Sequence, residues 1–279
     1  MRLATYNIRH GQTGAACTSG TVVAGRPPSA DCGLDLSASI AVMRALDAHV
    51  IAVQEVDRGW ARSDYVDQPA ALAAGLGMTH QCYAANLDHP PDAHSAVRHQ
   101  YGTLILSRFP ILGCGIAALR RTGDNEQRGL TRAVVDVFGV RLQVFHTHLH
   151  TTAADRVLQS ADVAGALDSA PAGPKVLMGD LNAGPDAAEM QPLVERLRDA
   201  WTVAPTADNP SGFTAPARLA VNPTRRIDYV LVSPDFQVSR AWVPIDARTR
   251  LASDHYPVVA EVTLRSAAST AGASPACPP

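Results

Sequence analysis

Short apolar runs of strand length alternate with helix-length amphipathic segments from residue 3 to residue 264. Two of these runs, residues 132–137 and 140–145, are separated only by Phe138 and Gly139, which is the pattern of a β-hairpin. A hairpin at the centre of the chain departs from the strict strand–helix–strand order of a parallel sheet. The pattern therefore predicts an α/β fold with two mixed, mainly antiparallel sheets packed face to face and helices outside.

The other elements follow from the same periodicities. Asp35 is expected to cap a helix over residues 36–46, and Gly77 to end a helix over residues 68–76. Residues 80–99, which contain four histidines, are expected to form a polar loop. Further helices are predicted at residues 152–167 and 187–197. Strands are predicted at residues 3–8, 50–53, 103–107, 175–178, 227–232 and 256–264.

The composition favours one domain with a continuous core, because 46% of the residues are hydrophobic. We assign residues 1–265 to this domain and expect the small, polar residues 266–279 to be a disordered tail. No apolar run reaches 18 residues, which excludes a transmembrane helix. The first residues lead directly into a strand without a signal peptide, so the chain as written is expected in the cytoplasm, or outside it if a signal was removed.

The five cysteines form no Cys-x-x-Cys motif, which argues against a structural zinc site. Cys17 and Cys32 bracket a stretch rich in Gly, Ser and Pro. In an oxidising compartment a disulfide between them would close this loop, and in a reducing one they would be two free thiols. The sequence leaves both alternatives open.

Chemically capable side chains recur where the predicted strands end. Asn7 lies in an otherwise apolar strand, and Glu55 follows the buried run 50–53. A carboxylate there is costly unless it is paired or binds a metal. The alternatives are an asparagine that bonds the backbone and an exposed glutamate.

His146, His148 and His150 fall on one face of a predicted strand, because side chains alternate along a strand. Three imidazoles on one face can bind zinc, so a binuclear zinc hydrolase is one interpretation. In the other interpretation only one of them faces a substrate phosphate.

Asp180 and Asn182, in Gly-Asp-Leu-Asn, follow a strand and can respectively polarise a water and donate an amide hydrogen bond to a developing oxyanion. The alternative is an Asx turn. Asp228 begins another apolar strand, and Asp254-His255 precedes the last one. A buried aspartate beside a histidine fixes its tautomer and keeps it charged, whereas a turn-capping Asp254 with an exposed His255 is the alternative.

Taken in order, these motifs resemble the endonuclease/exonuclease/phosphatase superfamily over residues 3–264. The resemblance implies a four-layered α/β sandwich and a catalytic domain that hydrolyses phosphate esters with Mg²⁺ or Mn²⁺. It implies that Glu55 holds the metal with help from Asn7, and that Asp254 is a further acid at the metal, often acting through water. Such a set of oxygen ligands suits Mg²⁺. The three-histidine zinc site would leave these other motifs without a role.

The resemblance also implies the catalytic roles. Asp180 matches the acid that orients or deprotonates the attacking water, and Asn182 the amide that stabilises the transition state. His255 matches the histidine beside the scissile phosphate, with Asp228 as its supporting carboxylate. His148 matches a second phosphate-facing histidine, so the neighbouring His146 and His150 are expected only to line the cleft.

Two positions concern the substrate. Arg128 lies in a Glu-x-Arg-Gly segment similar to one in bacterial branches of the superfamily, where it could clamp a phosphate, and the alternative is a solvated arginine. Tyr101-Gly102-Thr103 stands where many relatives have Gly-Asn, so the pocket role of that asparagine does not carry over to this chain. Tyr101 becomes the candidate substrate-binding residue.

The formal net charge of −2 gives no strongly basic footprint for nucleic acid, and aromatic residues make up only 5% of the chain. We therefore expect a phosphodiesterase acting on a small molecule, an inositol phosphate-like compound or a lipid headgroup. A nuclease with little sequence preference is the alternative within the class. A non-catalytic binding module on the same fold is disfavoured, because every matching position carries a competent residue. No obligate protein partner is predicted.

Overall fold

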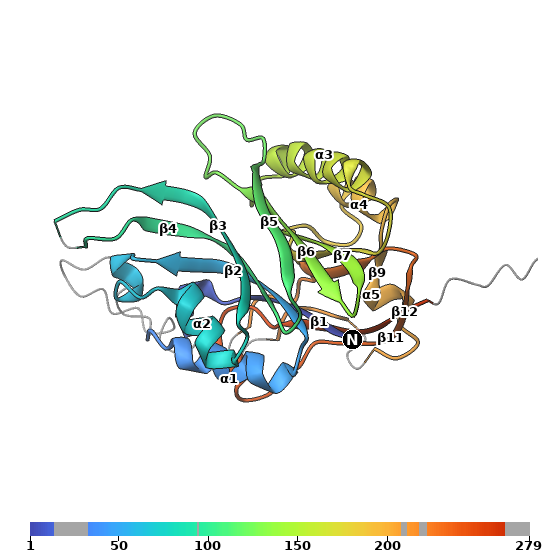
Figure 1. Cartoon of the computed structure of the whole chain (residues 1–279), viewed down its shortest axis with the longest axis horizontal. Helices are drawn as coiled ribbons and strands as arrows, with labels where there is room; N and C mark the ends of the chain where they lie inside the picture. The colour runs from blue at the N-terminus through green and yellow to red at the C-terminus, as the bar shows by residue number, and fades with distance from the viewer. Residues whose placement is uncertain (14–32, 94, 208–210, 218–221, 266–279) are drawn as a thin grey trace, which may run out of the picture.

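In the computed structural model, two six-stranded sheets pack face to face (Figure 1). The structure describes residues 1–13, 33–93, 95–207, 211–217 and 222–265. The first sheet contains β1 (Arg2–Asn7), β2 (Val50–Arg58), β3 (His80–His89), β4 (His99–Ser107), β11 (Phe236–Trp242) and β12 (Val258–Leu264). The second contains β5 (Ile111–Ala118), β6 (Gly129–Val137), β7 (Val140–His148), β8 (Lys175–Asp180), β9 (Arg198–Asp199) and β10 (Asp228–Val232).

The strand order is β11-β12-β1-β2-β4-β3 in the first sheet and β5-β6-β7-β8-β10-β9 in the second. Each sheet has one parallel pair, β1 with β2 and β7 with β8, and its other pairs are antiparallel. The helices are α1 (Leu36–Leu46), α2 (Gln68–Leu76), α3 (Ala153–Ser169), α4 (Gln191–Val194), α5 (Ala200–Val203) and α6 (Thr249–Ala252), and a 3₁₀ turn η1 (Arg9–Gly11) follows β1. The predicted fold class is confirmed.

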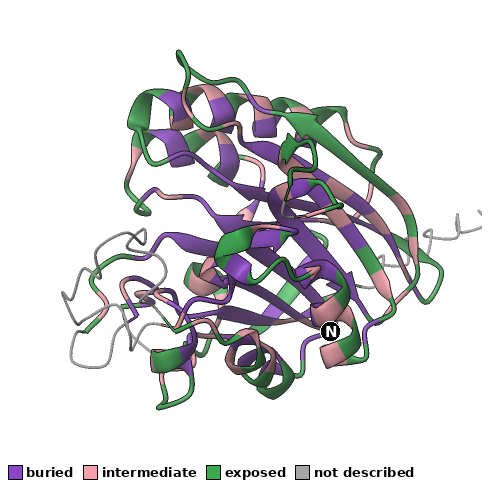
Figure 2. Cartoon of the chain, turned by 90° about the vertical axis from the view of Figure 1, so that its left-hand side faces the viewer, coloured by how far each residue is buried: buried purple, intermediate pink, exposed green. Residues whose placement is uncertain are grey.

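Three apolar interfaces separate four layers, and strand alternation explains them. In β2, Val50 and Ala52 face the other sheet, whereas Ile51 and Val53 face the outer layer of α1 and α2. A third cluster fills the space between the second sheet and helices α3 and α4. The buried residues accordingly run through both sheets and along the inner faces of the helices (Figure 2).

Several elements match their predicted bounds for the expected reasons. The Asp35 carboxylate accepts a hydrogen bond from the Ala38 amide and begins α1, and Gly77, at φ +64°, ends α2. The helix predicted over residues 187–197 is wrong. A 3₁₀ turn (Ala188–Met190) and the single-turn α4 take its place, because Pro192 has no N–H to continue the preceding turn and instead begins a new one.

The loop predicted over residues 80–99 is also largely wrong. Its first half is β3, which pairs antiparallel with β4 up to His89 opposite His99. Cys82 and Ala84 are buried, whereas Gln81 is exposed and Tyr83 is half-buried, so the segment has the alternation of a strand. The many histidines of this segment hid that alternation.

A disulfide joins Cys82 of β3 to Cys114 of β5, and so links edge strands of the two sheets. The sequence analysis considered only Cys17 and Cys32, which lie outside the described residues, as does the predicted tail. Among the described residues, no helix is both long enough and apolar enough to cross a bilayer.

Candidate active site

Strand register gathers the predicted residues at one end of the sandwich. The parallel pairing of β7 with β8 places His148 opposite Asp180, and the antiparallel pairing of β10 places Asp228 on the other side of Asp180. Gly179 permits this packing, because a Cβ there would lie 1.9 Å from the Thr147 carbonyl oxygen. Three chemically capable side chains therefore lie in one row across the second sheet.

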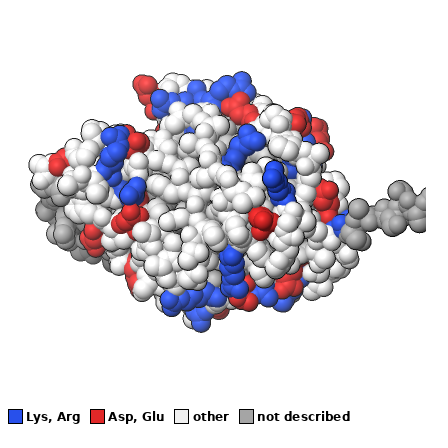
Figure 3. Space-filling view, in the orientation of Figure 1, with Lys and Arg blue, Asp and Glu red and all other residues white. Residues whose placement is uncertain are grey.

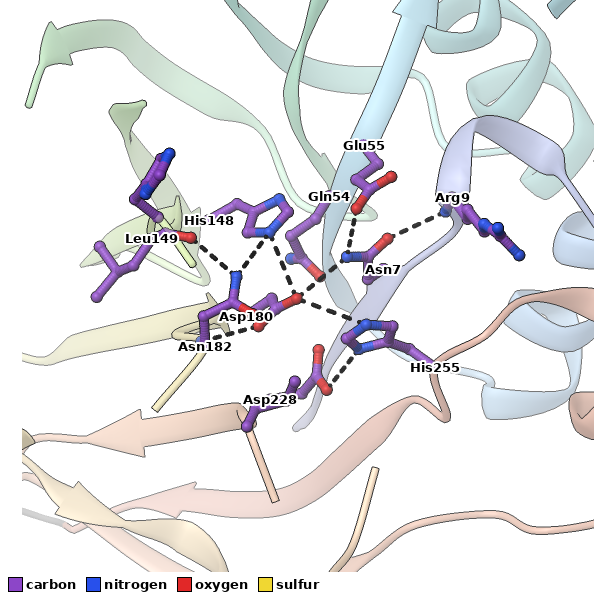
Figure 4. Close-up of polar contacts among 12 residues, drawn as sticks. Asn7, Arg9, Gln54, Glu55, His148, Leu149, Asp180, Asn182, Asp228 and His255 are labelled. Atoms are coloured by element: carbon purple, nitrogen blue, oxygen red, sulfur yellow. Dashed lines mark hydrogen bonds and ion pairs between the residues drawn. The ribbon is translucent and has the colours of Figure 1, made fainter. Parts of the chain in front are cut away.

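The Asp180 carboxylate is the centre of the site (Figure 4). Its Oδ2 accepts a hydrogen bond of 3.1 Å from Asn7 Nδ2, and lies 3.5 Å from His148 Nε2 and 3.7 Å from His255 Nε2. Burial and the charge of Asp228 raise the pKa of Asp180 above its ordinary value. The carboxylate is thereby a better proton acceptor than an exposed aspartate.

His255 and Asp228 form a buried pair, with Nδ1 and Oδ2 2.9 Å apart. Burial alone lowers the pKa of His255, but the charges of Asp228 and Asp180 outweigh burial and raise the pKa to about 10. His255 is therefore an imidazolium at neutral pH, with its Nε2 turned to Asp180. The alternative of an exposed histidine does not hold.

Asn182 and His148 meet on the other side of Asp180. Asn182 Nδ2 lies 3.1 Å from His148 Nε2 and donates to the Leu149 carbonyl oxygen at 2.9 Å. Its backbone amide donates to Asp180 Oδ1 at 2.9 Å, so the Asx turn is present and itself aims the side chain. Burial, reinforced by the charge of Arg128, lowers the pKa of His148 well below its ordinary value. His148 is neutral, and Asn182 must give up one of these contacts to reach a substrate.

Glu55 occupies a break in the strand ladder. The β2–β4 register shifts between Val53 and Val56, and Glu55 has a φ of +58°. Glu55 Oε1 accepts a hydrogen bond of 3.1 Å from Asn7 Nδ2, while Asn7 Oδ1 accepts one from the Arg9 amide. Burial by itself raises the pKa of Glu55, but the adjacent His10 imidazole and the Asn7 amide outweigh burial and hold the pKa well below its ordinary value. Glu55 is therefore an ionised ligand candidate.

The donor set fits a hard divalent ion. Asn7 links the carboxylates of Glu55 and Asp180, and the His255 imidazolium lies between those of Asp180 and Asp228. A cation would offset the excess negative charge of these three carboxylates. Ligand atoms of Asp180, Asp228 and His255 lie within 4.8 Å of one another. Because His255 Nδ1 and Asp228 Oδ2 already bond each other, Glu55 is the ligand that an ion reaches without breaking this pair.

Asp254 lies apart from this group. Its carboxylate pairs with Arg9 Nε at 3.6 Å and remains about one-third exposed, and no contact joins it to Glu55 among the described residues. The neighbouring Ser253 donates to the Asn7 carbonyl oxygen at 2.7 Å and so ties the last loop to β1. The sequence analysis gave no role to Ser253, which belongs to the Ser-Asp-His motif, or to Arg9, which follows Asn7 by two residues.

His146 and His150 do not line the cleft as expected. His146 is fully buried between the sheets, where its Nε2 lies 2.6 Å from Gln54 Nε2, and burial lowers its pKa to about 3. His150 lies beyond the end of β7 and contacts Thr152 and Asp155 at the start of α3. The three histidines have separate partners, which does not favour the zinc interpretation.

Arg128 is 7% exposed and is not a solvated loop arginine. Its Nη1 lies 3.3 Å from Glu126 Oε1, yet neither Nε nor Nη1 makes a hydrogen bond. Buried donors without partners suit an anionic ligand. Tyr101 is buried too, and the Arg62 guanidinium lies 5.0 Å above its ring.

A sequence model of the Endonuclease/Exonuclease/phosphatase family matches residues 4–255. Among solved structures, an endonuclease/exonuclease/phosphatase from Beutenbergia cavernae is 27% identical, with 95% of this chain and 71% of that one covered and a TM-score of 0.71. The mannosyl-6-phosphatase Bt3783 of Bacteroides thetaiotaomicron is 20% identical, with 95% and 100% covered and a TM-score of 0.69.

Sphingomyelinase C from Streptomyces griseocarneus is also 20% identical, with 93% of this chain and 98% of that one covered and a TM-score of 0.62. Below 25% identity these likenesses concern the fold. No curated protein matched the sequence. The family match covers nearly all of the chain and includes every residue gathered around Asp180. The chain therefore belongs to the endonuclease/exonuclease/phosphatase family.

Proposed function

We propose that this protein is a divalent-metal-dependent phosphodiesterase that cleaves a small-molecule or lipid-headgroup diester by attack of water. Family membership makes it a hydrolase of phosphate esters, in a family that generally depends on divalent metals. The observation that carries the finer proposal is the convergence of Asn7, His148 and His255 on the Asp180 carboxylate. These side chains come from both sheets, and their common target is the group that can take a proton from water.

In this proposal Asp180 accepts the proton of the attacking water, which its raised pKa favours. The His255 imidazolium, held by Asp228, donates to a phosphate oxygen as negative charge develops there. Asn182 exchanges its contact with His148 for the same phosphate group. Glu55, with Asn7 beside it, would hold a divalent ion, which would supply positive charge to neutralise the phosphate.

The charge balance around the site supports a diester. Three arginines near the site each have a carboxylate neighbour, namely Arg9 with Asp254, Arg62 with Asp57, and Arg128 with Glu126. These arginines therefore add little uncompensated positive charge to the site before an ion binds. A phosphodiester carries one negative charge, whereas a monoester carries up to two, so this balance favours the diester.

The surface supports a small or lipid substrate over nucleic acid. Arg120 pairs with Asp162, Arg226 pairs with Asp199, and Arg132 lies over the Phe145 ring. On the face seen in Figure 3, basic and acidic side chains are interspersed and form no continuous basic track. Binding to nucleic acid without sequence preference depends on such a track of phosphate contacts.

The test is hydrolysis by the purified 279-residue chain with Mg²⁺, Mn²⁺ or EDTA. The substrates are bis-p-nitrophenyl phosphate, p-nitrophenyl phosphate, inositol phosphates, choline and inositol phospholipids, and plasmid DNA. We expect diester or lipid cleavage that EDTA abolishes, with plasmid DNA left intact. Glu55→Gln should lose at least about a thousandfold in kcat/KM at limiting metal, whereas the matched control Glu195→Gln, on an exposed side chain, should not.

Each other outcome contradicts part of the proposal. Plasmid nicking that EDTA abolishes would make the protein a nuclease. Preference for monoesters would contradict the charge argument. Turnover of none of these substrates, in a chain that melts normally, would favour a binding module on the same fold.

A further inference from the structure

His10 is a buried imidazole for which the proposed reaction has no role. The residue is 9% exposed, and neither ring nitrogen makes a hydrogen bond. Burying a polar group without a partner costs free energy, so such a group in a folded protein indicates a ligand or water that completes it.

The nearest charged group to its ring nitrogen is the proposed metal ligand. His10 Nδ1 lies 3.6 Å from Glu55 Oε2. Two ligand atoms that each lie about 2.0–2.2 Å from one ion are at most about 4.4 Å apart. The observed separation is therefore within the span of one shared ion. Asn7 occupies Oε1 of the same carboxylate, which leaves Oε2 for that ion.

The backbone holds this pair in place from both sides. His10 has a φ of +45°, which a histidine adopts only at a cost in free energy. Gln68 Nε2 donates to the His10 carbonyl oxygen at 2.7 Å, and Gln68 Oε1 accepts from the Asp57 amide at 2.9 Å. One side chain thus fixes both the turn that carries His10 and the strand that carries Glu55.

We propose that His10 supplies an imidazole nitrogen ligand to the divalent ion held by Glu55, and that this ligand makes the site prefer Mn²⁺ to Mg²⁺. The inference rests on the proposed metal-dependent function and names the ion that serves it. Imidazole nitrogen raises affinity for first-row transition ions, whereas Mg²⁺ prefers oxygen ligands and retained waters. With Glu55 alone, the site would show no such preference from its ligands.

The test compares Mn²⁺ and Mg²⁺ binding by isothermal titration on the chelator-treated 279-residue chain, with pulsed electron paramagnetic resonance of bound Mn²⁺. The variant is His10→Asn, because asparagine tolerates positive φ and offers an oxygen in place of the ring nitrogen. We expect Mn²⁺ affinity to fall at least about tenfold, Mg²⁺ affinity to change less than about threefold, and the ¹⁴N coupling of imidazole to weaken or disappear.

The matched control is His80→Asn, at the end of β3 remote from Glu55 in the strand register, and it should bind both ions as the wild type does. Glu55→Gln should lose both ions. Wild-type Mn²⁺ without imidazole ¹⁴N coupling would overturn the inference even if His10→Asn did not fold, and so would unchanged Mn²⁺ affinity in a folded His10→Asn. Wild-type protein that binds neither ion would instead contradict the metal-dependent function itself.

Discussion

The two sheets bring different chemistry to the active site, and they position it differently. The first sheet and its following turn contribute Asn7, His10 and Glu55, which suit an ion. The second contributes Asp180 and Asp228, to which the proposed reaction assigns proton transfer and the support of His255. In the second sheet, strand register aligns these side chains once Gly179 allows the close packing, whereas His10 and Glu55 are non-glycine residues with positive φ angles. In this protein, strand pairing aligns the residues proposed to transfer protons, whereas the residues proposed to hold the ion lie on strained backbone.

His255 joins the two halves. It precedes β12 of the first sheet, yet its imidazole bonds Asp228 of the second. The Ser253 hydroxyl, two residues earlier, donates to the Asn7 carbonyl oxygen at 2.7 Å. The same loop is therefore also anchored to β1, beside the residues proposed to hold the ion. The division of roles therefore depends on how the sheets are held together, and substitutions can test it.

The largest expected effect separates proton transfer from ion binding. Asp180→Asn should lower kcat about 10³–10⁴-fold, because the amide cannot accept the proton of water. Mn²⁺ affinity, measured by titration, should change less than about threefold, since the proposal assigns Asp180 to proton transfer and not to ion binding. If Asp180→Asn instead lost the ion as completely as Glu55→Gln, the two halves would not be distinct, and Asp180 would be a metal ligand.

A smaller effect should come from the partner of His255. Asp228→Asn removes the charge that keeps His255 protonated, so the pKa of His255 falls from about 10. Since the proposed reaction needs the imidazolium, the variant should lose activity at a lower pH than the wild type does as the pH rises. Its kcat/KM should be about 100-fold below that of the wild type at pH 9, with a smaller difference at pH 6. A pH–rate profile measures this shift. An unchanged alkaline limb would mean that the charge of His255 does not matter.

A further, smaller loss should follow from shortening the buried guanidinium. Arg128→Lys keeps the charge but loses the planar pair of donors, so kcat/KM should fall about 10–100-fold, mainly through KM. Steady-state kinetics on the best diester measures this. The control is Arg141→Lys, on an exposed residue of β7. Equal effects of the two substitutions would remove Arg128 from the substrate site.

Local sequence patterns predicted where Asp180 and Asp228, the residues proposed for proton transfer, lie in the fold. Gly-Asp-Leu-Asn and Ile-Asp-Tyr follow or begin apolar runs, so alternation already indicated that Asp180 and Asp228 lie at strand ends. The sequence set His148 apart from His146, but the expectation that His146 lines the cleft was wrong, because His146 is a buried core residue.

The pairing of His10 with Glu55, proposed to hold the ion, was harder to predict, because it depends on backbone distortion and on contacts between distant segments. His10 follows Asn7 closely and precedes Gly11, which was an available signal for a tight turn at the site. Nothing in the sequence indicated that Gln68 would fix this turn. The disulfide was missed for the same reason, since pairing of Cys82 with Cys114 requires that edge strands of separate sheets already be adjacent.

The smallest expected effect on activity comes from breaking the disulfide, which tests whether this bond contributes to ion binding or to proton transfer. In the strand register Cys82 lies opposite Ile105, whose other neighbour Ala52 is three residues before Glu55. Breaking the bond should therefore leave kcat/KM within about twofold. It closes a sequence separation of 32 residues, so its loss should lower the free energy of unfolding by about 2–4 kcal/mol.

Urea unfolding of Cys82→Ala, Cys114→Ala and the double variant measures this loss. Because either substitution breaks the same bond, the double variant should be about as unstable as the less stable single variant, rather than the sum of both. Additive losses would mean that packing of the cysteines, and not the link, provides the stability. A large fall in kcat with little loss of stability would show that the covalent link aligns the site residues of the first sheet with those of the second. Catalysis would then depend on how closely the sheets are held, beyond the residues that each contributes.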